Sequence, residues 1–205
     1  MVLVVSTIVE IVTFCVARLA SFATQDALFA RLAVETVFLF VVPAYIVRRV
    51  LRQPLGAFGL TWAGPRSWGM WVAVAACVVL PVAVLATRVP EVHAAYPVLR
   101  QARIEPWLLI PSTLAFATYG FAWEFLFRGF LMLGLRARWG GAAILLQAVP
   151  CALMHIGKPT LELAASFPGA LLFGAIAYRT GSIVPGWLLH VSIAMVMNFA
   201  CVFWP

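Results

Sequence analysis

The feature that most constrains the fold of this chain is a series of long apolar runs, separated by short segments that carry most of its charge. A helix needs about 20 predominantly apolar residues to cross the hydrocarbon core of a bilayer. The runs that approach or exceed this length are residues 2–22, 28–48, 69–87, 107–135, 141–157, 162–179 and 181–203. Because the runs are continuous rather than alternating, they predict helices and not the strands of a barrel.

The composition also indicates a membrane protein. Hydrophobic residues make up 64% of the 205 positions and charged residues only 10%, whereas charged residues form about a quarter of a soluble domain. We therefore predict an all-α, polytopic membrane helix bundle with about seven transmembrane helices, in a single membrane-embedded domain over residues 1–205. No basic region precedes the first run, which contains Glu10, so we expect it to be retained as an anchor and not cleaved as a signal peptide.

The net charge of +7 comes from arginines scattered among the connecting segments. This pattern is typical of residues that anchor loops at lipid headgroups, and we expect the bilayer and no nucleic acid as a partner. Two connections are long. Residues 49–68 mix Arg with Leu, Phe and Trp, which predicts a segment lying at the membrane interface. Residues 88–106 contain internal prolines and an even mix of charges, which predicts a solvated loop.

Ionisable residues inside the runs are few, and each is a functional-site hypothesis because burying it in lipid costs on the order of 2.5 to 3.5 kcal/mol. They are Glu10, Glu35, Glu124, Arg128, His155 and His190. Glu124 and Arg128 are four residues apart with the acid first, which favours an ion pair on one helix face. Such a pair serves either packing or chemistry. For Glu10 and Glu35 we expect structural ion pairs with Arg18 or Arg31.

A glutamate and two histidines inside one bundle are typical of a site that activates water. In one chemistry the three side chains hold a metal ion with water at the open position. In the other, the carboxylate takes a proton from water while the histidines orient that water or stabilise an oxyanion. The spacing leaves both open, although the compact zinc signature H-E-x-x-H is absent from the sequence. The four cysteines are predicted to be core thiols, with no disulfide or metal cluster: Cys15, Cys77, Cys151 and Cys201.

Three stretches resemble the motifs of one family. "WEFLFRGFL", "CALMHIGKP" and "SIVPGWLLHVS" are similar to the three motifs of the CPBP family, the CAAX-protease and bacteriocin-processing glutamic intramembrane proteases. The family pattern is a glutamate pair with an arginine four residues on, an aromatic residue four before a histidine, and a histidine with Asn or Asp four later. Arg128, His155 and His190 match in order and separation. The resemblance covers roughly the last 100 residues and implies a protease core over residues 107–203.

The chain departs from the family pattern at three positions. Trp123 replaces the first glutamate, the family's usual water activator, so that Glu124 alone remains of the pair. Cys151 replaces the aromatic residue, and Ala194 stands where Asn or Asp is expected, with Asn198 one turn further along. Two interpretations follow, namely a variant branch that works through Glu124 or a protein that kept the fold and lost the chemistry. We favour the variant branch.

The combination of WE-x-x-x-RG with H-x-GKP resembles the myxosortase-like, sorting-type members of the family, and "HIGKPTLE" supplies a further acid, Glu162. For Glu162 we expect a role as a helix first-turn acid after Pro159.

Together with the residues, this resemblance implies a metal-independent intramembrane endopeptidase that needs no cofactor. Its catalytic residues would be Glu124, Arg128, His155 and His190. Glu124 would act as general base on water, the histidines would position the water and stabilise the oxyanion, and Arg128 would hold Glu124. The expected substrate is a membrane protein or lipidated peptide with a C-terminal processing or sorting signal, in a bacterial inner (plasma) membrane. The alternatives are a non-catalytic CPBP-fold membrane protein, such as an immunity or peptide-binding factor, and then a zinc enzyme.

Overall fold

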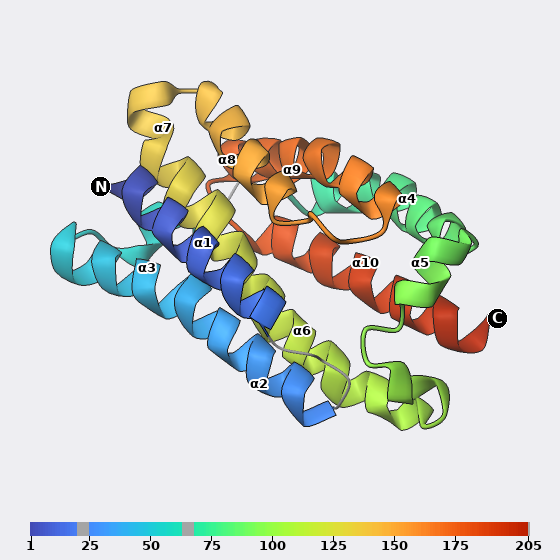
Figure 1. The fold of residues 1–205 in the computed structure, drawn as a ribbon. Coiled ribbons are helices and arrows are strands. Elements are labelled where there is room, and N and C mark those ends of the chain that lie inside the picture. The colour runs from blue at the N-terminus through green and yellow to red at the C-terminus, as the bar shows by residue number, and fades with distance from the viewer. Residues whose placement is uncertain (20–24, 63–67, 205) are drawn as a thin grey trace.

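The computed structural model describes residues 1–19, 25–62 and 68–204, and within these ranges every regular element is helical. Contiguous elements group into long helical segments: α1 (Val2–Leu19); α2 (Gln25–Thr36), η1 (Val37–Val41), α3 (Val42–Tyr45) and η2 (Ile46–Val50); α4 (Trp68–Ala86); α6 (Leu109–Glu124), η6 (Phe125–Leu133) and α7 (Gly134–Trp139); α8 (Ala142–Leu153); α9 (Thr160–Thr180); α10 (Val184–Phe203). This confirms the predicted all-α bundle. In Figure 1, α6 runs through the bundle with α2 on one side and α10 on the other, and α9 packs beside α8.

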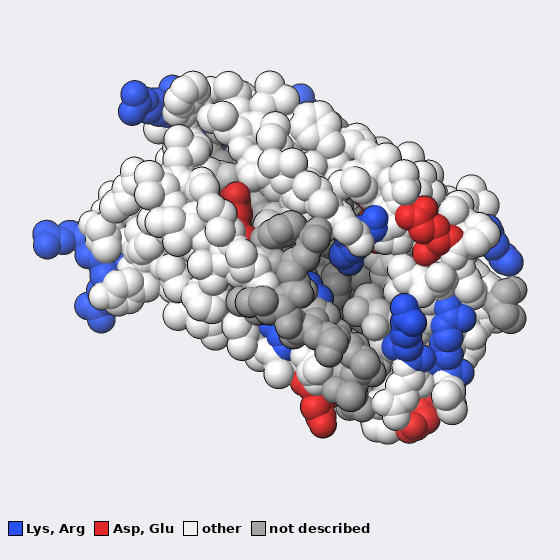
Figure 2. Space-filling model, in the orientation of Figure 1, with Lys and Arg blue, Asp and Glu red and all other residues white. Residues whose placement is uncertain are grey.

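The chain is an integral membrane protein by the length and hydropathy of its helices. Within the described residues, four helical stretches are long and apolar enough to cross a bilayer, Asp26–Val50, Trp68–Ala86, Thr160–Thr180 and Val184–Phe203. Val2–Thr13 and Ala142–Leu153 are shorter apolar helices. Figure 2 shows Lys and Arg projecting at the end beside α3 and α7 and gathering at the opposite end near α5, with mostly uncharged residues and a few charged side chains visible between them. This distribution is typical of a bundle whose two ends meet water.

The connection over residues 88–106 is folded, and the prediction of a solvated loop is wrong. It contains α5 (Pro90–Ala95) and two short 3₁₀ turns, η4 (Arg100–Arg103) and η5 (Pro106–Leu108). Val92, Tyr96 and Leu99 are buried in it, because these apolar residues pack against α2, α4, α6 and α10. The segment therefore forms a fixed cap over one end of the bundle.

The described part of the 49–68 connection packs between η6 and the start of α10. Its 3₁₀ turn η3 (Leu55–Phe58) buries the Phe58 ring in the main core. Gly59 follows with a φ of 85°, a conformation that favours glycine, and its carbonyl accepts the Ile183 N–H at 3.1 Å. Residues 63–67 of the predicted segment lie outside the described residues.

The π-helix η6 (Phe125–Leu133) begins directly after Glu124, and its backbone hydrogen bonds join residues i and i+5. Such turns are rare and occur frequently at functional sites. Its Gly129 follows Arg128 and packs against the chain at Phe58, since a Cβ added to Gly129 would lie 2.5 Å from the Phe58 carbonyl oxygen. The small residue after Arg128 thus lets the 49–68 connection reach the helix that carries the site.

Candidate active site

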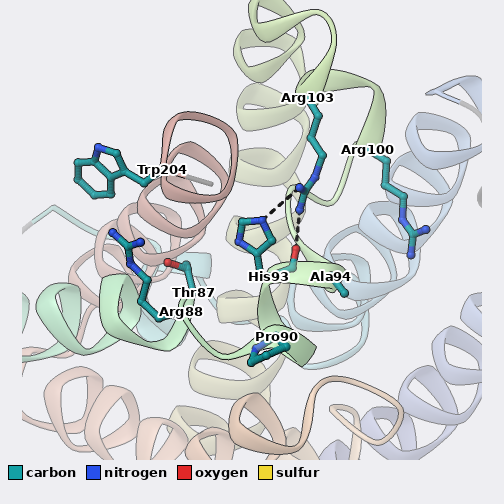
Figure 3. A pocket seen from close by; sticks show the side chains of 8 residues that line it. All are labelled: Thr87, Arg88, Pro90, His93, Ala94, Arg100, Arg103 and Trp204. Atoms are coloured by element: carbon teal, nitrogen blue, oxygen red, sulfur yellow. Dashed lines mark hydrogen bonds between the residues drawn. The ribbon is translucent and has the colours of Figure 1, made fainter.

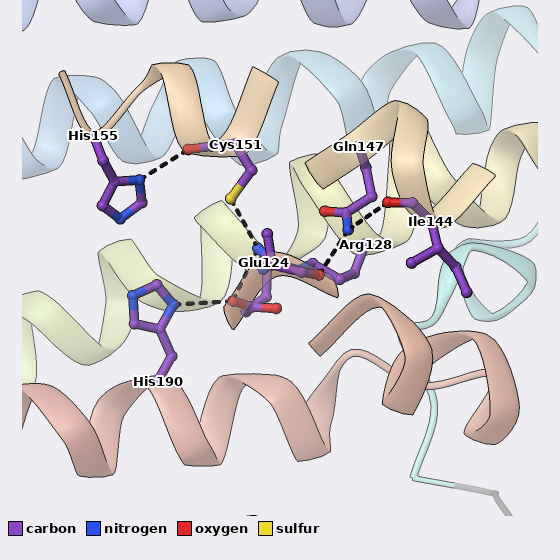
Figure 4. A network of polar contacts seen from close by, with 8 residues as sticks. Glu124, Arg128, Ile144, Gln147, Cys151, His155 and His190 are labelled. Carbon is purple, nitrogen blue, oxygen red and sulfur yellow. Dashed lines mark hydrogen bonds and ion pairs between the residues drawn. The ribbon is translucent and has the colours of Figure 1, made fainter. Parts of the chain in front are cut away.

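Glu124, the last residue of α6, is fully buried and lies at the centre of a network of polar side chains (Figure 4). One of its carboxylate oxygens, Oε1, lies 3.3 Å from Nη1 of Arg128 and 2.9 Å from Nδ1 of His190. The ion pair between Glu124 and Arg128 that the spacing predicted is confirmed. Because a buried charge is costly without a partner, the guanidinium stabilises the charged form of the carboxylate in this apolar bundle.

The other carboxylate oxygen, Oε2, has no hydrogen-bond partner among the described residues, although it is buried. It faces Gly186 in the first turn of α10, where an added Cβ would lie 2.9 Å from Oε2. Only glycine allows α10 to approach the carboxylate this closely. A buried acceptor without a partner is unusual and costly, and a water molecule or a polar substrate group would satisfy it.

His190 belongs to α10 and presents a free ring nitrogen beside Glu124. An ionised carboxylate only accepts hydrogen bonds, so Nδ1 of His190 donates to Glu124 and Nε2 is the free acceptor of the neutral ring. The side chain of His190 is 21% exposed, whereas Glu124 is 0% exposed. The rings of Phe116 and Phe173 flank the imidazole at centroid distances of 6.2 and 6.0 Å. Nε2 of His190 is therefore the accessible end of the Glu124–His190 pair.

His155 lies two residues beyond the end of α8 and is half-buried. Its Nδ1 lies 2.8 Å from the Cys151 carbonyl oxygen, which can only accept, so Nδ1 donates and Nε2 is free. Figure 4 shows His155 and His190 approaching each other from α8 and α10, on the same side of Glu124. The structure thus brings together the four residues that the sequence pointed to. Arg128 and His190 contact the buried carboxylate of Glu124, and His155 lies opposite His190.

Arg128 makes two further contacts besides its ion pair with Glu124. Its Nη1 also donates to Sγ of Cys151 at 3.5 Å, and its guanidinium lies 5.5 Å from the centroid of the Phe173 ring. The sequence predicted Cys151 only as a core thiol, and the signal for its contact with Arg128 was its position in the second motif. The contacts with α8 and α9 fix the arginine so that it in turn fixes Glu124.

Trp123, which replaces the family's first glutamate, is 5% exposed and packs among aromatic rings. Its ring centroid lies 4.8 Å from Phe127, 5.8 Å from Tyr119 and, edge to face, 5.5 Å from His155. The indole therefore forms an apolar wall behind His155 and supplies no acid or base to the site.

Asn198 and Glu162 both tie elements together and neither contacts His190. The Asn198 side chain donates to the Ala194 carbonyl at 2.7 Å and accepts the Val98 N–H at 2.8 Å, which fixes the 88–106 cap to α10. Glu162 accepts the Tyr96 hydroxyl at 2.9 Å and pairs with Lys158 at 3.4 Å. Burial and the neighbouring Glu162 raise the pKa of the Tyr96 phenol well above its ordinary value.

The two remaining intramembrane acids lie away from this network. Glu35 forms the predicted ion pair with Arg31, with 2.7 Å between Nε and Oε1. Glu10 has one buried carboxylate oxygen without a hydrogen-bond partner in the described part of the chain, and the Arg18 side chain that was predicted to pair with it lies outside the described residues.

Gln147 is a buried polar residue that sequence reasoning missed. Its side-chain amide donates to the carbonyls of Ala170 at 2.8 Å and Ile144 at 3.0 Å (Figure 4), and Gly174 makes room for it, since a Cβ there would lie 2.6 Å from Nε2. The one polar residue in the apolar run "AAILLQAVP" was the available signal. Gln147 joins α8 to α9 and so helps to set the wall that carries His155.

The described side chains include no group of three or more His, Cys, Asp or Glu placed to hold a metal ion. The donor set at the site consists of one carboxylate, already engaged by a guanidinium, and two imidazoles with free Nε2 atoms. This arrangement can accept protons from a water molecule and hold that molecule in place.

Residues 105–196 match the family model Rce1-like, described as type II CAAX prenyl endopeptidase Rce1-like. The matched range includes Glu124, Arg128, His155 and His190, and it confirms the resemblance to the CPBP family. Searches of curated proteins and of solved structures found no match.

Proposed function

Because residues 105–196 are an Rce1-like segment of the CPBP family, we propose that the protein is an intramembrane endopeptidase in which Glu124 acts as general base on a water molecule. The observation that carries this proposal is the Glu124 carboxylate itself, which is buried, paired with Arg128 and left with one oxygen that has no partner among the described residues. Arg128 is a positioning residue, because it acts on the reaction through Glu124. The zinc enzyme remains the third candidate, and metal in stoichiometric amount with loss of activity on chelation would support it.

The hydrolytic step needs a proton to leave the attacking water. In the direct route the proton passes to Glu124 at Oε2, while the free Nε2 atom of His155 or of His190 accepts the other hydrogen of the water and orients it. The hydroxide then adds to the peptide carbonyl, and the same proton is returned to the leaving amine. A histidine stabilises the oxyanion only when its Nε2 carries a proton. The direct route leaves the transferred proton on Glu124, whereas a route through His190 places that proton on Nε2.

A relayed route is favoured by the greater exposure of His190. Here Nε2 of His190 takes the proton, and Glu124 stabilises the resulting imidazolium through Nδ1. The variant His190→Gln distinguishes the two routes. Cleavage that is slowed but measurable supports direct transfer to Glu124, and complete loss supports the relay.

The substrate belongs to the proposal as well. The site residues lie among apolar helices, so a scissile bond would reach them from within or beside the bilayer, which fits a membrane-associated substrate. We propose a membrane protein or lipidated peptide with a C-terminal processing or sorting signal, as in the myxosortase-like branch, in a bacterial inner membrane crossed several times by this chain.

Comparative proteomics of cells that carry the wild type or Glu124→Gln tests the proposal and identifies the substrate at the same time. Loss of a general base typically costs about 10²- to 10⁴-fold, so uncleaved precursors should accumulate with Glu124→Gln and likewise with His155→Ala and His190→Ala. The matched control is Glu35→Gln, because Glu35 is also a buried membrane carboxylate paired with an arginine four residues away. Membrane levels of each variant are measured by immunoblot.

Precursors that accumulate equally with Glu35→Gln, or not at all with Glu124→Gln, contradict the proposal. The second candidate is a non-catalytic membrane protein of the same fold that binds a peptide, for example an immunity factor. It is favoured by Trp123 in place of the first acid of the family pattern. A cellular phenotype that survives all three substitutions at Glu124, His155 and His190 would establish that candidate instead.

A further inference from the structure

A pocket of about 620 Å³ lies at the end of the bundle that is closed by the 88–106 cap. Its charged and aromatic lining consists of Arg88, His93, Arg100, Arg103 and Trp204 (Figure 3). These residues come from the segment after α4, from α5 and η4, and from the residue after α10. The pocket is separate from the proposed active site, because Trp204 is about 20 Å from His190 along α10 at 1.5 Å per residue.

The pocket is strongly basic, judged by the described residues that line it. Three arginines line it, no Asp or Glu does, and none of the three forms an ion pair within the described part of the chain. The arginines inside the bundle differ, since Arg31 and Arg128 each pair with a glutamate. Arg100 also borders a second pocket, which Glu91 lines. Guanidinium groups that share one pocket without an ion-pair partner repel one another, so an anion bound among them would relieve that repulsion.

Arg103 is fixed in place by the cap and points its guanidinium at the pocket. Its Nη2 donates to the carbonyls of His93 and Tyr96 at 2.6 Å each, and its Nη1 lies 3.2 Å from Nε2 of His93. Figure 3 shows Arg88 and Trp204 on the opposite side of His93 from Arg103, with Arg100 further along the cap. One arginine is thus pre-organised, while Arg88 and Arg100 are exposed side chains free to close on a ligand.

The position of the pocket matches the polar boundary of a bilayer. Arg88 follows α4 closely and Trp204 follows α10 directly, and both helices are long and apolar enough to span a membrane. Tryptophan is enriched at the headgroup level, where the apolar ring meets lipid and the N–H meets water. The pocket therefore opens where phosphate groups of lipids are found.

From this geometry we propose that the pocket binds a phosphate-bearing anion, supplied by the headgroup of an anionic phospholipid or by free phosphate. Arginine suits this ligand because its planar fork of N–H donors matches phosphate oxygens in pairs. Arg88 and Arg100 would supply the paired donors to the phosphate oxygens, while Arg103, whose Nη2 already donates to two carbonyls, would contribute its positive charge and its remaining N–H groups. Anion binding involves no peptide hydrolysis, so this proposal can be tested independently of the proposed function.

Thermal unfolding of the purified full-length protein in detergent tests this site. The three arms are mixed micelles with phosphatidylglycerol, mixed micelles with phosphatidylcholine at equal mole fraction, and inorganic phosphate against chloride at equal ionic strength. The test variant is Arg88→Gln/Arg100→Gln, which leaves the structural Arg103 intact. The matched control is Arg49→Gln/Arg138→Gln, which removes the same charge from exposed arginines outside the pocket.

We expect phosphatidylglycerol to raise the unfolding temperature of the wild type and the control, as a ligand that binds only the folded state does. The concentration needed should be about tenfold higher or more for Arg88→Gln/Arg100→Gln, since two charge-assisted contacts are lost. A shift with phosphatidylglycerol alone identifies a lipid headgroup, and a shift with phosphate as well shows that the phosphate group suffices. Equal stabilisation of the test and control variants, or no shift of the wild type in either anionic arm, overturns the proposal.

Discussion

Replacing Gly186 by alanine places a methyl group against the carboxylate on which the proposed chemistry depends. The added Cβ would lie 2.9 Å from Oε2 and 3.6 Å from Cδ of Glu124, whereas ordinary van der Waals contacts begin at 3.4 Å. The carboxylate or α10 must therefore move by about 0.5 Å. The carboxylate has little freedom to do so, because Arg128 and His190 hold its other oxygen.

A displacement of this size sets the expected loss of activity. Misplacement of a reacting group by 1 Å can cost about 10²-fold, so we expect cleavage by Gly186→Ala to slow by about tenfold. Overpacking of a core typically costs about 1–3 kcal/mol of stability, so the variant should still fold. The assay is a pulse-chase measurement of cleavage of a precursor identified by proteomics, together with thermal unfolding in detergent.

Gly169→Ala in α9 is the matched control, because an added Cβ meets nothing within 4 Å there and alanine favours a helix over glycine. A double-mutant cycle with Glu124→Asp sharpens the test. The shorter acid withdraws its carboxylate from Gly186, so Gly186→Ala should cost less in that background than in the wild type. Full activity of Gly186→Ala, or equal losses for it and Gly169→Ala, would refute the reasoning.

Two further predictions concern the scaffold. Gly129→Ala should lower the unfolding temperature by several degrees, because its Cβ would meet the main-chain oxygen of Phe58 at 2.5 Å and such overpacking costs about 1–3 kcal/mol. Gly56→Ala is the control, since a Cβ there meets nothing within 4 Å. Equal melting temperatures of the two variants would contradict the prediction. The pKa of Tyr96 is raised by burial and by Glu162, so the folded protein keeps a proton that the unfolded chain loses near pH 10. The contribution of the Tyr96 phenol to stability is complete below about pH 10 and is lost as the pH rises further. The unfolding temperature measured from pH 8 to 11 should therefore fall less steeply for Tyr96→Phe than for the wild type. Identical declines would count against this prediction.

Much of the fold could be predicted from local features of the sequence. The runs at 69–87 and 181–203 correspond within a few residues to α4 and α10, because each ends where Arg, Gly or Pro interrupts the apolar pattern. The pair of Glu124 and Arg128 followed from helical spacing alone. The cap over residues 88–106 was missed, since its prolines and charges conceal the apolar residues Val92, Tyr96 and Leu99, which are buried only through contacts with distant helices.

The contacts in the site that depend on how the helices approach one another could not be predicted from the sequence. Gly186 is one of several glycines in apolar segments, and only the position of α10 shows that it faces the Glu124 carboxylate. The same holds for the contact of Arg128 with Cys151, which joins η6 to α8. The spacing of the motifs indicated which residues meet. It did not indicate which ring nitrogen of each histidine stays free, because that depends on the partner of the other nitrogen, the Glu124 carboxylate for His190 and the Cys151 carbonyl for His155.

Trp123 decides how the site must work if it is catalytic. Arg128 is the one cation in contact with Glu124 among the described residues, and its Nη1 already serves both Glu124 and Cys151. A second carboxylate at position 123 would therefore be buried beside His155 without a cation of its own, at a cost that the indole avoids. With the indole in place, the site has one acid and one guanidinium in balance. The accessible nitrogens of His155 and His190 then hold the water, and Glu124, directly or through His190, is the base that remains to activate it.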